Sequence, residues 1–307
     1  MNSLSTPAIS SLPKPRAGLG FGALLAASIG VIVAQIGMVA VMQGVGIGGW
    51  GFFVAMVVAF AIALANAMAY AEMALMMPSA GSLSSYAEAA IGNFPAILLV
   101  FAGYVTPALF GLPAELILAD QILTQAIPLH LPPFAWPVML VVVFAGLNIL
   151  GTDVFAKVQT TLSFTVLLFL VVTGLLALSG QAATPMVGGS TLAFAAMGKD
   201  TVTMGVVALA FWVFVGSEFV TPLVPDASNA KRDLPRAMIG GLIVIFLAEL
   251  LFAVGAAALI PRDKLAASAT PHLDYAVAVF GPNARVWFAV LALLASASLL
   301  NTVLAAV

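Results

Sequence analysis

The sequence lacks cysteine and carries very few charged residues. Without cysteine, the chain can form no disulfide, no thiolate nucleophile and no cysteine-based zinc site. Charged residues make up 7% of the 307 positions and hydrophobic residues 63%, whereas soluble domains carry about 25% charged and roughly 45–50% apolar residues. Such a chain could not cover a soluble surface. The composition therefore excludes a soluble enzyme, a nucleic-acid-binding protein and a disordered protein, and it indicates a polytopic membrane protein.

The small number of histidines and the lack of enzyme motifs narrow the range of possible functions. The only histidines, His130 and His272, stand far apart in the sequence, which argues against a histidine-rich metal site. Residues 46–51 read GIGGWG and satisfy the spacing of a dinucleotide-binding loop, but no strand precedes them, so we interpret them as a tight connection between helices. We find no nucleophile–base spacing, and we expect no enzyme, no metal and no cofactor.

Long apolar segments dominate the rest of the chain. A membrane helix needs about 20 mostly apolar residues, and the run from Leu19 to Met42 exceeds the ~7–15 residues of a signal-peptide core. The segments do not alternate apolar and polar residues, as strands of an outer-membrane barrel would. We therefore predict an all-α fold with about eight transmembrane helices after a cytoplasmic tail at 1–18. The segments are 19–42, 51–77, 95–125, 134–151, 154–179, 202–226, 236–260 and 285–307.

Basic residues predict the orientation. Cytoplasmic loops carry an excess of lysine and arginine, and residues close to a helix end count most. The basic cluster directly after segment 202–226 lies on the same side as the N-terminus, which we place in the cytoplasm. The cytoplasmic group is Lys14, Arg16, Lys157, Lys231, Arg232 and Arg236, and the opposite group is Lys199, Arg262, Lys264 and Arg285.

Five acidic residues fall within or near membrane depth: Glu72, Glu115, Asp120, Glu218 and Glu249. A charge there costs a few kcal/mol and usually faces a cavity or a partner. Glu72 and Asp120 are near segment ends and could simply reach the interface. Glu115 remains ambiguous. For Glu249, a neutral carboxyl hydrogen-bonded between helices is the simpler interpretation.

Glu218 has a different setting, since Gly216 precedes it and Pro222 and Pro225 follow it. Glycine and proline weaken the sixth helix where the carboxyl appears. The first helix contains Gly30 and the stretch 34–37 (AQIG), which predicts a second interruption, although small residues also serve close helix packing. Because secondary transporters build midplane binding sites from paired broken helices, we expect a binding site between helices one and six.

Three stretches resemble the amino acid–polyamine–organocation superfamily of amino acid permeases. Residues 70–92 resemble the family's Tyr-x-Glu…Pro-x-Ala-Gly-Gly…Tyr run between helices two and three, and residues 216–218 its Gly-Ser-Glu. Residues 226–238 resemble its Glu-x-x-Asn-Pro-x-Arg-x-Ile-Pro-Arg-Ala-Ile loop between helices six and seven. The matching residues are Tyr70, Glu72, Pro78, Ala80, Gly81, Tyr86, Gly92, Gly216, Glu218, Asn229, Arg232, Pro235, Arg236 and Ala237.

The resemblance implies the leucine-transporter (LeuT) fold, in which five helices are followed by five more in inverted topology. Residues 19–179 would then form the first five-helix repeat, and residues 202–307 three helices of the second. On this reading, the resemblance predicts that the chain is truncated at its C-terminus.

The resemblance also implies a substrate-binding site. A substrate carboxylate would meet backbone N–H groups near 30–37, because helix N-termini favour anions, and an amino group would meet carbonyls near 214–216. Phe211 and Trp212 would be gate or pocket-wall aromatics, with lipid-facing filler as the alternative. The implied substrate-binding residues are Gly30, Ala34, Gln35, Ile36, Gly37, Phe211, Trp212, Phe214, Val215 and Gly216.

Two departures from the family pattern bear on binding and coupling. Family members often carry Gly-Ser-Gly-Ile in helix one where this sequence has AQIG at 34–37. Many also carry a lysine in helix five that replaces a sodium ion, and we align that position with Val166. The coupling ion therefore stays open between a proton on Glu218 and sodium held by Ser296 and Ser298, since hydroxyl oxygens suit a hard cation.

These observations predict a secondary active transporter in a cell membrane, by the family's distribution a bacterial inner membrane. It would move an amino acid or related amine, coupled to H+ or Na+ or by exchange. The alternative is a truncated, non-transporting or partner-dependent membrane component. We expect a small-molecule substrate, a coupling ion and the lipid bilayer as partners, and no nucleic acid; the sequence carries no signal for the oligomeric state.

Overall fold

The computed structural model describes residues 18–127, 129, 131–186 and 202–306. Within these residues every regular element is a helix, and a single bridge joins Leu19 to Ala227. The all-α prediction is therefore confirmed. The elements are α1 (Phe21–Ile32), α2 (Gln35–Gly48), α3 (Trp50–Met76), α4 (Leu83–Ile91), α5 (Asn93–Val100), the π-helix η1 (Phe101–Val105), α6 (Thr106–Ala126), α7 (Ala135–Ile149), α8 (Thr152–Leu178), α9 (Met204–Trp212), the 3-10 helix η4 (Ser217–Asp226), α10 (Ala230–Leu259), α11 (Arg262–Ala267), α12 (Pro271–Phe280) and α13 (Ala284–Ala306).

Six helical stretches of the described chain are long and apolar enough to cross a membrane. The pair α1 and α2, bent by 52°, adds a seventh if it counts as one span. The segment predicted at 134–151 forms only the 15-residue α7, about 22 Å long at 1.5 Å per residue, against a hydrocarbon core of about 30 Å. The structure thus supports a polytopic membrane protein, and an eighth span stays a prediction.

Helix α10 lies at the centre of the bundle and packs against α1, α3 and α8. Helix α3 offers a buried row of small side chains at intervals of four, Ala55, Ala59, Ala63, Ala67 and Ala71. Residues four apart share a helix face, and small side chains let membrane helices approach closely. This row lets α3 pack against the bundle while its valines and isoleucines point outward.

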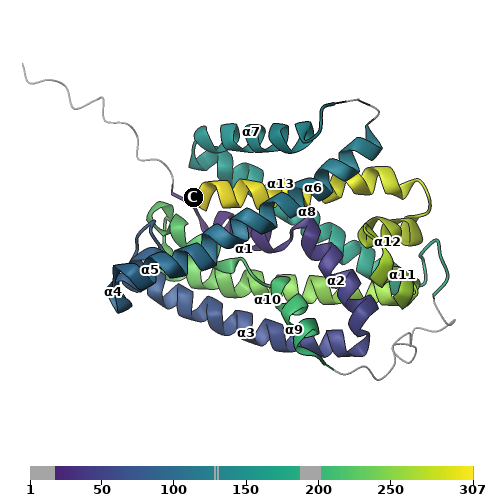
Figure 1. The fold of residues 1–307 in the computed structure, drawn as a ribbon, viewed down its shortest axis with the longest axis horizontal. Coiled ribbons are helices and arrows are strands. Elements are labelled where there is room, and N and C mark those ends of the chain that lie inside the picture. Colours follow the sequence, from purple (N-terminus) through teal and green to yellow (C-terminus); the bar gives the residue numbers. More distant parts are fainter. Residues whose placement is uncertain (1–17, 128, 130, 187–201, 307) are drawn as a thin grey trace, which may run out of the picture.

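The helices run largely along one direction, so the bundle has two ends (Figure 1). Helices α11 and α12 lie at one end, and α4 lies at the other (Figure 1). Arg262 and Lys264 belong to α11, while Lys231 and Arg232 begin α10. The predicted positions Lys14, Arg16 and Lys199 lie outside the described residues, as does His130, and the cytoplasmic N-terminus stays a prediction.

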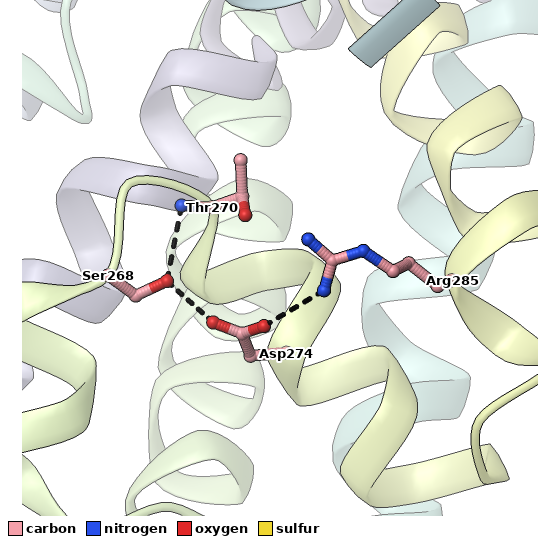
Figure 2. A network of polar contacts seen from close by, with 4 residues as sticks. All are labelled: Ser268, Thr270, Asp274 and Arg285. Carbon is pink, nitrogen blue, oxygen red and sulfur yellow. Dashed lines mark hydrogen bonds and ion pairs between the residues drawn. The ribbon is translucent and has the colours of Figure 1, made fainter. Parts of the chain in front are cut away.

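A polar network orders the connection from α11 to α12 (Figure 2). The Ser268 hydroxyl donates to the Asp274 carboxylate over 2.5 Å and accepts from the Thr270 N–H over 3.2 Å. Arg285, from α13, donates to the other carboxylate oxygen over 3.3 Å. The network holds the start of α12, which carries the buried His272, against α13.

Candidate functional site

The first helix is broken where the sequence predicts it. Helix α1 ends at Ile32 and α2 begins at Gln35, with Ala34 in an extended conformation between them (φ −72°, ψ 154°). A helix leaves its first N–H groups and its last carbonyls without intrahelical partners. A break at membrane depth therefore needs other groups to satisfy its backbone.

Glu115 of α6 satisfies the N-terminus of α2. Its carboxylate is fully buried and accepts hydrogen bonds from the N–H groups of Gln35 (3.0 Å) and Ile36 (2.8 Å). A negative charge is favourable at a helix N-terminus. Glu115, whose role the sequence left ambiguous, is thus a cap for the first break, although it lies 80 residues from Gln35 along the chain.

Further buried polar side chains extend from this cap. Ser296 Oγ, on α13, lies 2.5 Å from Glu115 Oε1 and 3.1 Å from Gln35 Oε1. Gln35 Nε2 lies 3.5 Å from Nε2 of His272, on α12. Residues from four helices meet behind the break, and this set is called the Glu115 cluster below: Glu115, Gln35, Ser296 and His272.

The sixth helical segment is also interrupted. Helix α9 ends at Trp212, and η4 begins at Ser217 after a turn. Gly216 in this turn has φ 134°, a conformation that favours glycine. Its N–H donates to Glu218 Oε2 over 3.1 Å. The prolines predicted to disturb this helix, Pro222 and Pro225, lie inside the 3-10 segment.

A cavity of about 90 Å³ lies between the two breaks. Both ends of the first break and the turn after α9 contribute to its wall, together with α6 and α13. None of the described lining residues carries a charged side chain. They are Val31, Ile32, Ala34, Ile36, Gly37, Pro107, Ala108, Gly111, Leu112, Trp212, Val215, Gly216, Phe219, Leu299 and Val303.

The structure brings six of the ten predicted substrate-binding residues to this cavity: Ala34, Ile36, Gly37, Trp212, Val215 and Gly216. The other four lie outside the lining. Gln35 belongs to the Glu115 cluster, Gly30 faces α8 and α13, and Phe214 is in the core against Phe60, with ring centroids 6.3 Å apart. Phe211 packs, partly buried, against the same core.

The three predicted ion-coupling residues face different groups. Glu218 accepts from Gly216, and Ser296 belongs to the Glu115 cluster. Ser298 is fully buried in a second polar cluster beneath Gly30. The structure therefore does not bring the two serines together at one site.

That second cluster contains residues that sequence reasoning missed. Gln159 Nε2, on α8, donates to Ser163 Oγ (2.9 Å) and Ser298 Oγ (2.8 Å) and lies 3.4 Å from the Ala26 carbonyl oxygen. Ser163 donates to the same carbonyl over 2.7 Å. Gln159 and Ser163 are four residues apart in an apolar helix, a spacing that could have revealed them. Val166, aligned above with the family's lysine, is buried in the hydrophobic core instead.

The remaining acidic residues differ in their surroundings. Glu72 is exposed and Asp120 half-buried, in keeping with positions near the interface. Glu249 of α10 is fully buried, and neither carboxyl oxygen has a hydrogen-bond partner among the described residues. The predicted interhelical hydrogen bond of Glu249 is therefore absent from the described structure.

Comparison with known proteins identifies the family to which the chain belongs. A family model described as "Amino acid permease" matches residues 19–307. The chain belongs to the amino acid permease family. The resemblance seen in the sequence is confirmed, and membership of this family points to a transporter rather than an enzyme.

A curated relative of this permease comes from Bacillus subtilis (strain 168) and carries the provisional name arginine/ornithine antiporter. It is 31% identical over 83 residues, which amount to 27% of this chain and 18% of the relative. The chain thus matches less than a fifth of the relative's length, and the similarity is weak evidence for any particular substrate.

Proposed function

We propose that this permease is a secondary active transporter that moves an amino acid or a related amine across a cell membrane. The observation that carries the proposal is the pair of broken helices beside one cavity. At both breaks, backbone N–H groups donate to buried or half-buried carboxyl groups of the protein, which stabilises the interrupted backbone. Broken helices that line a cavity are the means by which many secondary transporters bind their cargo.

The arrangement supports a LeuT-like architecture. The breaks fall in the first span and in the first span after residue 202, as two inverted repeats beginning at 19 and 202 would require. Transport would then proceed by rocking of one helix group against the other around the cavity. We assign substrate contact to the six predicted residues at the cavity and to Phe219, whose ring is 5.0 Å from that of Tyr104.

For coupling, we favour a proton on Glu218 over sodium at Ser298. Glu218 lies at the second break, where its carboxyl accepts a hydrogen bond from the N–H of Gly216 in the turn. The Ser298 cluster has three oxygens that could serve a cation, but Nε2 of Gln159 already donates to two of them and lies near the third. A hard cation needs several oxygens free to turn toward it.

The decisive experiment is uptake into proteoliposomes. Purified protein would be reconstituted and assayed for counterflow of labelled leucine, ornithine, putrescine and 3-methylbutylamine, with protein-free liposomes as the background. Saturable counterflow of at least one compound supports the proposal. Monodisperse protein that gives no counterflow and no saturable binding would favour the non-transporting or partner-dependent alternative.

The coupling assignment has its own test. Uptake by the Glu218→Gln variant should lose its dependence on external pH, because the amide cannot take up or release the proton. The matched control is Glu249→Gln, which changes a fully buried carboxyl that makes no hydrogen bond to either break among the described residues and should keep the pH dependence. Replacing sodium with N-methylglucamine should leave wild-type uptake unchanged. Unaltered pH dependence in Glu218→Gln, or loss of uptake without sodium, would contradict the assignment.

A further inference from the structure

The two helix breaks share a feature that bears on the kind of substrate. At the first break the N–H groups that begin α2, and at the second the N–H group just before η4, donate to a carboxyl group of the protein itself. Glu115 takes the N–H groups of Gln35 and Ile36, and Glu218 takes that of Gly216. Backbone N–H groups at helix N-termini are what binds anions in such sites. Here they are already occupied.

The carbonyl groups at the end of α1, on the other side of the first break, have lost their helical hydrogen-bond donors. In a continuous helix, the N–H groups of Gln35 and Ile36 would donate to the carbonyls of Val31 and Ile32. They donate to Glu115 instead, so α1 ends with these carbonyls released from helical pairing. Val31 and Ile32 both line the cavity. A helix C-terminus also carries partial negative charge.

The end of α9 also lies at the cavity. Helix α9 ends at Trp212, which lines the cavity together with Val215 and Gly216. The N–H of Gly216 bonds to Glu218 rather than to a carbonyl of the preceding turn. The cavity is therefore bordered by the C-terminal ends of α1 and α9. The Phe211 and Trp212 carbonyls already accept from the N–H groups of Phe214 and Val215, so the carbonyls that are released toward a positive charge are those at the end of α1.

The rest of the wall offers little to a second polar group. The described lining side chains are aliphatic or aromatic, and none is lysine, arginine or histidine. A substrate carboxylate would lie in this apolar wall without a charged partner, at a cost of several kcal/mol. A hydrocarbon chain would instead match the wall. A second ammonium group would find no acidic side chain among the lining residues.

We infer that the cavity binds the ammonium group of an apolar monoamine that lacks a carboxylate, because Glu115 already occupies the position at the start of α2 that a substrate carboxylate would take. The inference rests on the proposed function, since it names the class of substrate for the same cavity. It replaces the expectation from the resemblance that a substrate carboxylate binds near residues 30–37.

The test compares amino acids with the amines that differ from them only by the carboxylate. Binding to the purified full chain would be measured by titration calorimetry for leucine against 3-methylbutylamine, and for phenylalanine against 2-phenylethylamine. Putrescine, which adds a second ammonium group, completes the set. We expect each monoamine to bind at least about tenfold more tightly than its amino acid and more tightly than putrescine.

Two alanine variants then locate the cause. Glu115→Ala frees the N–H groups of Gln35 and Ile36 and leaves room for a substrate carboxylate. The preference for 3-methylbutylamine over leucine should fall about tenfold. The matched control Glu249→Ala removes another fully buried carboxyl and should keep the wild-type preference. If Glu115→Ala does not fold, the wild-type comparison still decides.

The outcomes separate the inference from the proposed function. Saturable binding in which leucine equals or exceeds 3-methylbutylamine would overturn the inference and leave the transporter proposal standing. Equal loss of preference in both alanine variants would also overturn the role of Glu115. Absence of saturable binding of every probe to monodisperse protein would instead overturn the proposed function, and the inference with it.

Discussion

Both helix breaks have a backbone N–H group bonded to a carboxyl group of the protein, but that carboxyl group comes from a different place in each break. At the second break, the elements are local: Gly216 adopts φ 134° and its N–H is accepted by Glu218, two residues further along. At the first break, no glycine with positive φ is present between α1 and α2, and the cap comes from Glu115 on α6. One break is encoded in a short stretch of sequence, while the other depends on packing between distant helices.

This difference has a physical consequence. A locally capped break has its donor and acceptor held close together by the chain itself. A break capped from a distant helix exists only where α6 lies against α2, so its geometry responds to any movement between these helices. If the proposed rocking transport occurs, the first break is therefore the better place for it to be linked to substrate binding.

The largest effect should come from changing the local break itself. Gly216→Ala places a side chain in a strained conformation and against the Val31 side chain, which should lower the free energy of unfolding by about 3 kcal/mol. The control Gly240→Ala adds the same methyl group to α10, where nothing lies within 4 Å. Thermal unfolding in detergent measures both, and equal midpoints would contradict the local character of the second break.

The next largest effect tests the distant cap. Glu115→Leu keeps the volume of the side chain but leaves one buried and one part-buried N–H group without acceptors, which should destabilise the protein by about 2 kcal/mol. Glu249→Leu should instead be neutral or stabilising, because the Glu249 carboxyl has no hydrogen-bond partner among the described residues. If the two variants unfold at the same temperature, Glu115 is not a cap.

A third prediction concerns how α1 is held below its break. Gly30 lies against Gln159, Ser163 and Ser298, and an added methyl group would collide with all three. Gly30→Ala should therefore destabilise by about 1–2 kcal/mol. Gly22→Ala, in the same helix with nothing within 4 Å, is the control and should be neutral or slightly stabilising. A Gly30→Ala variant as stable as this control would show that the polar cluster does not anchor α1.

The smallest effect is expected far from both breaks. Arg285→Ala removes an ion pair with Asp274 in which both side chains are about half exposed. Exposed ion pairs contribute about 0–1 kcal/mol, so we expect a shift of less than about 1 kcal/mol in unfolding, which added salt should reduce. A loss as large as that of Glu115→Leu would mean that the placement of α12, and of His272 in the Glu115 cluster, depends on this pair.

Much of the fold is readable from the sequence. Apolar length alone predicts the six spans found in the structure, and Gly216 with the two prolines predicts the second break. The predicted break at 34–37 also appears, but its cause is not what the residues suggest. The polar Gln35 and its small neighbours were expected to interrupt the helix there, whereas Ala34 is extended and a remote carboxylate caps α2.

The candidate site was only partly readable, and Gln159 and Phe214 show why. Gln159 lies in α8 and Phe214 in the turn after α9, and both belong to long apolar segments, because lipid and neighbouring helices are equally apolar surroundings. Hydrophobic periodicity then cannot tell which face of a helix points to the cavity. Phe214, predicted at the site, turns into the core, and Gln159, which was overlooked, meets α1 and α13.

By itself, the sequence determined that the protein is a helical membrane permease with a weakened sixth helix, because hydropathy, glycine and proline act through the local chain. Only the tertiary structure decided that Glu115 caps the first break and that the carbonyl ends of α1 and α9 border the cavity. Those features arise from the rotation and contact of helices distant in the chain. Helix packing determines such contacts, and an apolar composition does not predict them.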